Sequence, residues 1–205
     1  MYQLPHQCII NKPLYKTAVF EKFNLKTAER DRFDADISRM AIVAYVSPKK
    51  IPALAEGQNI KEFYVLQVQL KKRDYDTKNI LLLHKLISQN LIFALEYEGN
   101  VQFCIFYTRL QQSDWLRESE AIIPLRGLNF DDIWNNIVAE IGGLDNEAEE
   151  SLEQQITNRE ELEKLLQQIA SLEKRIINEK QTRKKYELHQ QLLKLKGQIQ
   201  NGHGK

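Results

Sequence analysis

The amino-acid sequence predicts an α+β fold, a mainly antiparallel sheet with flanking helices, followed by a C-terminal coiled-coil or helical-hairpin tail. Three observations predict it. Residues 1–144 read in the order helix, helix, strand, strand, helix, hairpin, strand, helix. Two apolar-aromatic runs flank Glu98-Gly99-Asn100, as in an antiparallel β-hairpin. Residues 145–196 contain neither glycine nor proline and repeat leucine and isoleucine at spacings of three and four.

The length fits one domain with a helical appendage. The 205 residues are expected to divide into an α+β core over 1–144, a coiled coil or helical hairpin over 145–200, and a disordered end over 201–205. A hydrophobic content of 42% is enough for a packed core. The net charge of +1 argues against a surface that is devoted as a whole to nucleic acid.

The composition indicates a cytoplasmic protein. Cys8 and Cys104 are too few for a disulfide framework and suit a reducing compartment, each as a small buried hydrophobe. Residues 1–16 lack the charged start and apolar run of a signal peptide. No stretch reaches the ~20 apolar residues of a membrane span. We therefore expect a soluble protein without a membrane partner.

Two helices and two strands are predicted in the first half of the core. Thr27 is a plausible N-cap for the second helix. The first strand is rich in β-branched and aromatic residues and stops at Ser47-Pro48, and the second alternates apolar and polar residues. The predicted elements are helices at 15–23 and 27–39 and strands at 39–46 and 63–70.

A helix, a hairpin, a short strand and a final helix are predicted in the second half of the core. Asp76 or Thr77 caps the first of these helices. The final helix is capped by Asn129 or Asp131 and ended by Gly142-Gly143. The predicted elements are a helix at 74–88, hairpin strands at 91–97 and 101–108, a strand at 121–125 and a helix at 129–141.

The tail carries two apolar stripes, which we predict to be its partner-binding residues. On a straight helix of about 100° per residue the two stripes point roughly 130° apart. A helical hairpin that bends near Lys180-Gln181-Thr182 lets them face each other, whereas a continuous helix with two partners, or with a stutter, is the alternative. The first stripe is Leu162, Leu165, Ile169, Leu172 and Ile176, and the second is Leu188, Leu192, Leu195 and Ile199.

Charge divides the tail into an acidic and a basic part. Residues 145–163 hold eight acids and one base, a net charge of −7. Residues 164–205 hold ten bases and three acids, a net charge of +7. A hairpin is therefore expected to place the acidic arm beside the basic arm, with bases near Glu149, Glu150, Glu160 and Glu161.

The sequence predicts no catalytic, cofactor-binding or metal-ligating residue. The histidines His6, His84, His189 and His203 lack the spacing of a metal-binding pair, and neither Cys-x-x-Cys nor His-Glu-x-x-His occurs. His84 is expected to be a half-buried, hydrogen-bonded residue on a helix face. A phosphate-binding glycine-rich loop and a Gly-x-Ser-x-Gly elbow are also missing. These observations favour a non-enzymatic protein without a cofactor.

One enzymatic alternative, a divergent metal-dependent nuclease, rests on Gln69-Leu70-Lys71 at the end of a predicted strand. Such nucleases hold Mg²⁺ with carboxylates and use a lysine to stabilise charge on the phosphate. Glu62 or Asp36 could supply the acid. The simpler interpretation is a strand that ends in the solvated bases Lys71, Lys72 and Arg73.

A second alternative is a nucleic-acid-binding module that uses Arg183, Lys184 and Lys185 of the basic arm. Tyr186 could stack on a base, whereas Trp115 is expected to pack on the domain. The competing interpretation is that these bases pair with acids of the tail or are solvated. The basic surface would be extended by Lys174, Arg175, Lys180, Lys194 and Lys196.

Five segments of the chain resemble one known family. Together they are similar to the bacterial family catalogued as domain of unknown function 4391, and the resemblance covers nearly the whole chain, tail included. The chain departs from the family at Ala41 to Tyr45, where we expect a tryptophan early in the strand. The matching segments are 11–16, 38–52, 91–97, 124–128 and the tail from Leu172 to Leu188.

The resemblance implies a biological context, and since no catalytic residues are established for the family, none is carried over to this chain. Members are small accessory proteins encoded near helicases and DNA methyltransferases in restriction-modification-like or antiviral, phage-defence gene clusters. This implies a non-enzymatic adaptor subunit that binds a larger DNA-processing partner, a helicase or a DNA methyltransferase. The core would dock on the enzyme, and the tail would bind that partner, a second copy of the chain or its own core. Homo-oligomerisation through the tail and direct contact with DNA stay open.

Overall fold

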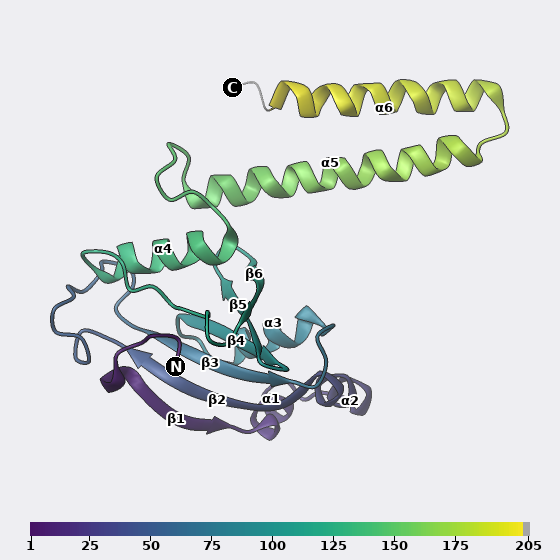
Figure 1. Ribbon diagram of the computed structural model, residues 1–205. Coiled ribbons are helices and arrows are strands. Elements are labelled where there is room, and N and C mark those ends of the chain that lie inside the picture. Colours follow the sequence, from purple (N-terminus) through teal and green to yellow (C-terminus); the bar gives the residue numbers. More distant parts are fainter. Residues whose placement is uncertain (203–205) are drawn as a thin grey trace. The chain divides into compact units, whose positions relative to one another are not determined.

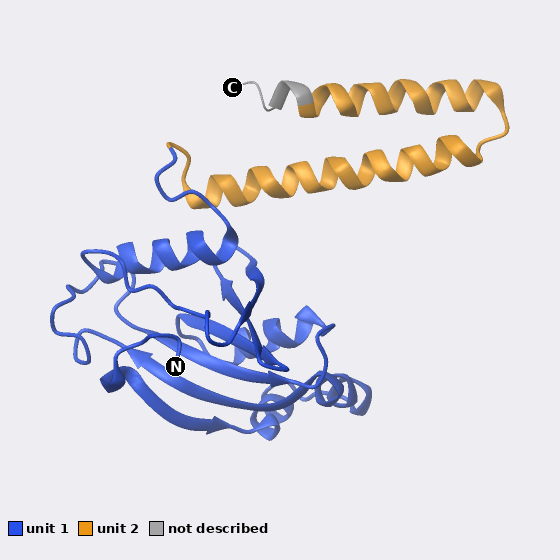
Figure 2. Ribbon diagram, in the orientation of Figure 1, with its two compact units in different colours: residues 1–148 blue, residues 149–205 orange. Residues whose placement is uncertain are grey.

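The computed structural model describes the backbone of residues 1–202 and the side chains of residues 1–199. The chain divides into two compact units, Met1–Ala148 and Glu149–Lys205 (Figure 2). The predicted core ends at residue 144, a few residues before this division. Residues 203–205, which include His203 and most of the predicted disordered end, lie outside the described residues.

A six-stranded sheet forms the centre of the first unit, and its strands lie in sequence order from β1 to β6 (Figure 1). Neighbouring strands are antiparallel except β3 and β4, which run parallel. A parallel pair requires a crossover, and helix α3 lies in that connection. The strands are β1 (Ile9–Leu14), β2 (Ile37–Val46), β3 (Phe63–Leu70), β4 (Leu91–Tyr97), β5 (Asn100–Phe106) and β6 (Leu110–Arg117).

Four α-helices belong to the first unit and two to the second. The helices are η1, a short 3-10 helix (His6–Cys8), α1 (Lys16–Lys22), α2 (Thr27–Asp36), α3 (Thr77–Leu86), α4 (Phe130–Gly142), α5 (Leu152–Asn178) and α6 (Thr182–Gly202). The predicted α+β class with a mainly antiparallel sheet is confirmed. Within the described part of the chain, every helix is too short or too polar to cross a membrane.

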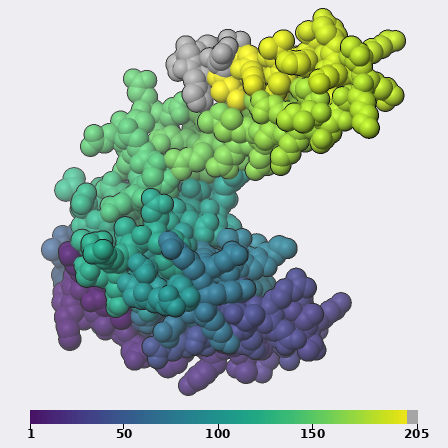
Figure 3. Space-filling model, turned by 45° about the vertical axis from the view of Figure 1, so that its right-hand side comes forward, coloured from purple at the N-terminus to yellow at the C-terminus, as the bar shows by residue number. Residues whose placement is uncertain are grey.

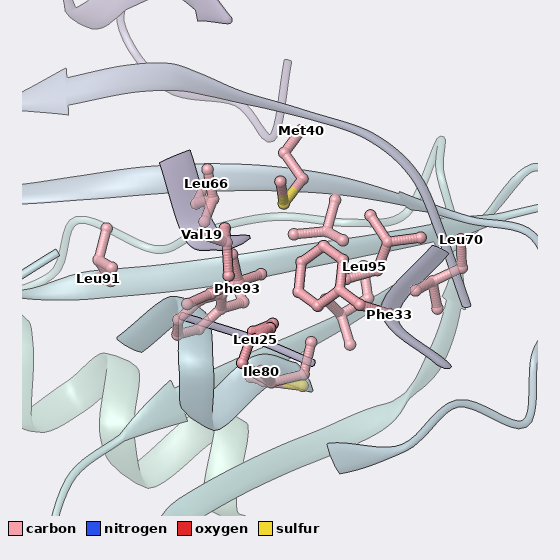
Figure 4. Close-up of a cluster of buried hydrophobic side chains, with 14 residues drawn as sticks. Val19, Leu25, Phe33, Met40, Leu66, Leu70, Ile80, Leu91, Phe93 and Leu95 are labelled. Atoms are coloured by element: carbon pink, nitrogen blue, oxygen red, sulfur yellow. The ribbon is translucent and has the colours of Figure 1, made fainter. Parts of the chain in front are cut away.

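Helices α1, α2 and α3 cover one face of the sheet. Successive side chains of a strand point to opposite faces, so Leu66 and Val68 of β3 share the face that these helices cover. They join a buried cluster that includes Phe33 of α2, Ile80 of α3 and Phe93 of β4 (Figure 4). Since burial of one such side chain contributes roughly 1.5–3 kcal/mol, this cluster holds the helices on the sheet.

Helix α4 covers part of the opposite face. Phe63 of β3 packs on Phe130 and Trp134, with ring centroids 6.2 and 5.7 Å apart. The side chain of Asn129 caps the helix by accepting a hydrogen bond from the Asp132 N–H at 3.0 Å. The helix ends at Gly142 and is followed by its C-cap Gly143, whose φ of 58° suits glycine best.

The structure confirms the most regular predicted elements. Strands 63–70 and 91–97 have the predicted bounds. The predicted hairpin closes with Tyr97 paired to Asn100, and Glu98 and Gly99 both have positive φ, 46° and 75°. Two positive φ values are what the favoured two-residue hairpin turn requires.

Predictions at both edges of the sheet are wrong or incomplete. Strands β1 and β6 are not predicted, because β1 contains Pro13 and exposed polar residues and half of β6 is glutamine, serine and aspartate. The predicted strand 121–125 is a loop, in which the Ile123 N–H donates to the carbonyl of Tyr2 at 3.1 Å. The predicted helix 27–39 ends at Asp36, since Ile37 is extended and begins β2.

The cap of α2 also differs from the prediction. Lys26, and not Thr27, is the N-cap, and the side chain of Glu29 accepts a hydrogen bond from the Lys26 N–H at 2.9 Å. For α3, Asp76 is the cap and accepts from the Lys78 N–H at 2.9 Å.

Asp131 anchors the loop before β3 to the start of α4. Its carboxylate accepts hydrogen bonds from the backbone N–H groups of Gln58, Asn59 and Ile60, the shortest two at 2.7 Å. These bonds, with that from Ile60 first, lower the pKa of Asp131. A Cβ atom on Gly57 would overlap the same carboxylate, so this close approach requires glycine.

We predict that Asp131→Asn lowers the free energy of unfolding by about 1–3 kcal/mol at pH 7, because part of a charge-assisted hydrogen-bond set is lost. Urea denaturation of the full chain measures this. Since the pKa of Asp131 is lowered in the folded chain, its stabilising contribution is complete above the ordinary carboxyl pKa of about 4 and is lost as the pH falls below it. The difference between the two proteins should therefore shrink in acid.

Asp31→Asn is the matched control, because Asp31 is exposed on α2. Gly57→Ala should destabilise the chain through the same contact from the loop side. Equal unfolding curves for Asp131→Asn and Asp31→Asn would show that the loop is held by other contacts.

Candidate protein-interaction site

The two helices of the second unit form an antiparallel hairpin with an apolar seam. Ile169, Leu172 and Ile176 of α5 meet Leu188 and Leu192 of α6, and each is at most 8% exposed. The chain turns over residues 179–181, between the two helices. The space-filling view shows the atoms of the two helices side by side (Figure 3).

Seven of the nine residues predicted to bind a partner belong to this seam, since Leu195 and Ile199 pack beside the buried five. Leu162 and Leu165 are half-buried and lie nearer the start of α5. The seven seam residues hold the two helices together from inside. Their contribution to partner binding stays a prediction.

An ion pair crosses the hairpin, with Lys196 Nζ 2.8 Å from Glu173 Oε1. The short turn sets the register, since α5 ends at Asn178 and α6 begins at Thr182. Counting back from the turn along antiparallel helices, Gly202 lies opposite about residue 160. The start of α5 therefore extends beyond the described end of α6 (Figure 1).

This register divides the acids of α5 into two groups. Glu149, Glu150 and Glu153 lie before the part of α5 that α6 accompanies, whereas Glu160, Glu161 and Glu163 lie near the described end of α6, so the expected pairing of the acidic arm with the basic arm stays a prediction. Glu160 pairs with Lys164 of its own helix at 2.7 Å. The charges differ along the hairpin. Acidic residues predominate over 149–163, at the start of α5, and basic residues predominate around the turn.

One broad side of the hairpin, which we call the apolar face, exposes four large apolar side chains. Helical spacing puts Leu166, Glu173 and Ile177 on one side of α5, and Tyr186, Leu193 and Lys196 on one side of α6. The Glu173–Lys196 pair shows that these two sides adjoin. The exposed fractions are 49% for Leu166, 77% for Ile177, 66% for Tyr186 and 57% for Leu193.

The opposite broad side, the polar face, has a different chemistry. A shallow groove of about 480 Å³ runs along it between the helices. Its floor is Leu172 and Leu195 of the seam, and its walls are amides, a hydroxyl and two bases. The wall residues are Gln168, Ser171, Arg175, Gln191, Lys194 and Gln198.

The predicted nucleic-acid-binding residues Arg183, Lys184 and Lys185 lie in the first turn of α6 and are exposed. Arg183 lies 3.4 Å from Glu187 one turn along the helix, and its side chain is 93% exposed. An exposed pair of this kind contributes little to stability. Tyr186 follows on the apolar face, whereas Trp115 packs on the core cluster of the first unit with Arg73 over its ring.

The residues of the nuclease alternative are separated by the sheet. Because Ile37 pairs with Leu70 and Val46 with Phe63, Asp36 and Glu62 lie at opposite ends of the β2–β3 pair. Only Asp36 is near Lys71, whose N–H donates to the Asp36 carbonyl at 2.7 Å.

The Asp36 carboxylate, 4% exposed, is itself occupied by structural contacts. It accepts from the Asp76 N–H and the Asn79 amide at 2.8 Å each, and it pairs with Lys72 at 2.8 Å. It therefore ties the start of β2 to the start of α3.

Glu62 is also engaged, as acceptor for the hydroxyls of Tyr45 and Tyr64. Burial and Glu62 raise the pKa of Tyr64 to about 12. In the described part of the chain, histidine, cysteine and acidic side chains form no group of three that could hold a metal ion.

Sequence reasoning missed a polar network on the sheet face beside α4. The Glu96 carboxylate of β4 accepts from the Tyr2 hydroxyl at 2.8 Å and from the Gln67 amide at 2.6 Å. Next to it, a groove of about 490 Å³ crosses β1, β2 and β3 and is lined by Arg39 and Gln69 among others. Tyr2 and Glu96 are distant in the sequence, and no local pattern brings them together.

His84 is half-buried as expected, but its hydrogen bonding differs from the expectation. Its ring stacks on Phe106 with centroids 4.3 Å apart. Among the described residues Nδ1 has no hydrogen-bond partner, and burial lowers the pKa of His84.

Comparison with known proteins identifies the family of the chain. The model of the family described as "Domain of unknown function (DUF4391)" matches residues 3–199. No curated protein and no solved structure matches the chain. The family match includes the strands of the sheet and the hairpin seam alike, so the resemblance seen in the sequence is confirmed. The chain belongs to the family of the domain of unknown function DUF4391.

Proposed function

We propose that this protein is a non-enzymatic adaptor that binds a larger protein partner and uses its helical hairpin as the interaction arm. The observation that carries the proposal is the hairpin itself. Its seam is filled by its own leucines and isoleucines, and it still exposes four large apolar side chains on one face. Exposed apolar groups of this kind on an otherwise charged helical pair are typical of protein-binding surfaces.

The partner is a DNA-processing enzyme, a helicase or a DNA methyltransferase, of a restriction-modification or antiviral defence system. This part of the proposal rests on the family membership and its expected genetic context. The chemistry of the first unit is compatible with an adaptor, because the carboxylates of Asp36, Glu62 and Asp131 are engaged in structural hydrogen bonds.

We predict that Leu172→Asp combined with Leu192→Asp abolishes co-purification of the full chain with a helicase or methyltransferase encoded beside it. A buried aspartate in the seam costs several kcal/mol and separates the helices. The measurement is recovery of the co-expressed enzyme on the tagged chain. Both tryptophans, Trp115 and Trp134, lie in the first unit, so their fluorescence reports separately whether that unit is folded.

Gln191→Asp is the matched control, because it adds a negative charge at an exposed position of α6 on the polar face, away from the apolar face. Equal recovery of the enzyme with the seam variant and the control, despite a loss of helicity in the seam variant, would remove the hairpin from the proposed function.

A second candidate function is nucleic-acid binding at the hairpin turn, favoured by the exposure of Arg183, Lys184 and Lys185. We predict that Lys184→Glu with Lys185→Glu then weakens binding of duplex DNA. The slope of log affinity against log salt should fall by about 1 for each phosphate that the variant no longer neutralises. Fluorescence anisotropy at several salt concentrations measures this slope. If the wild-type chain binds no DNA at low salt, the candidate fails.

A further inference from the structure

We propose that the apolar face of the hairpin is a dimer interface, on which a second copy of this chain packs antiparallel to form a four-helix bundle. The proposal deepens the proposed function, since it names the occupant of the apolar face and makes the adaptor a dimer. It rests on the same hairpin, but the two can fail separately.

The two broad faces of the hairpin differ in a way that favours one covered face. The polar face consists of glutamine, serine, arginine and lysine around its groove, which suits contact with water. The apolar face exposes Leu166, Ile177, Tyr186 and Leu193. A pair of helices buries only a single seam, whereas four helices enclose a core, so a second hairpin on this face completes a common architecture.

The distribution of charge favours a second copy of the chain as the partner of the apolar face. It also favours an antiparallel arrangement of the two hairpins. At the base of the hairpin, residues 149–163 hold six acids and one base. Around the turn, residues 174–187 hold six bases and two acids. In an antiparallel dimer, the acidic residues 149–163 of each copy lie toward the basic turn of the other copy. In a parallel dimer, like charges would lie together.

The antiparallel arrangement also satisfies the symmetry of a homodimer. A two-fold axis that lies across the hairpin stacks α5 on its equivalent and α6 on its equivalent, so each copy uses the same patch. Ala170 lies between Leu166 and Ile177 on the α5 side of this face, and its small side chain allows two α5 helices to approach closely.

The first test is the mass of the full chain in solution, by analytical ultracentrifugation over a range of concentrations. We expect a dimer for the wild type. Leu166→Asp with Leu193→Asp should weaken the dimer by more than about 100-fold, because four charges then enter one apolar interface. Both positions are exposed, so circular dichroism should show the helix content of the wild type. Gln191→Asp is the control, because Gln191 is exposed on the polar face, and it should leave the dimer intact.

The second test exchanges the charges of the two ends. Lys184→Glu with Lys185→Glu adds negative charge at the turn. Glu160→Lys with Glu161→Lys adds positive charge to the acidic segment 149–163. Each variant alone should dimerise at least about 10-fold more weakly than the wild type, and an equimolar mixture should recover a heterodimer near the wild-type affinity. In a parallel dimer the first variant would lose nothing, since like charges already face each other there.

The outcomes separate this inference from the proposed function. A wild type that stays monomeric, or a dimer that survives Leu166→Asp with Leu193→Asp, overturns the dimer interface. If the wild type is monomeric and these substitutions instead release the co-purified enzyme, the enzyme occupies the apolar face and only the dimer is lost. If the dimer forms as expected and no helicase or methyltransferase co-purifies, the proposed function fails and the dimer stands.

Discussion

The apolar seam between α5 and α6 is the interaction on which the surface chemistry of the tail depends. Ile169, Leu172 and Ile176 pack against Leu188 and Leu192, so the most regular apolar residues of the tail are buried against each other within one chain. Closing this seam fixes the rotation of both helices, and that rotation determines which weaker side chains remain outside. The apolar face, the polar face and the charged ends all follow from it.

Much of the fold could be predicted because its central elements are regular. Strands buried on both faces, such as β3 and β4, carry a dense apolar pattern, and Asn129 with Gly143 marks both ends of α4. The edge strands could not be predicted in this way, because half of their backbone and many of their side chains face solvent. Segment 121–125 was wrongly predicted as a strand for the opposite reason. Ala121 and Ile123 are apolar because they are buried, but they belong to a loop.

The candidate site was accessible from sequence only in part. The spacing of the leucines identifies the seam, but the surfaces beside it depend on the register of two helices, which a single sequence does not fix. The 27 residues of α5 against 21 of α6, together with the Glu173–Lys196 pair, decide where the charges come to lie. Long-range contacts such as that between Tyr2 and Glu96 have no local signature at all.

The two edge strands also determine whether a strand of another chain can add to the sheet. Pro13 removes a backbone donor from β1, whose exposed side chains include Asn11 and Lys12, and β6 presents Gln112 and Asp114 to solvent. A neighbouring chain therefore gains little by adding a strand at either edge. The sheet therefore resists strand addition at both margins, and the dimer that we propose would not compete with edge-to-edge pairing of sheets.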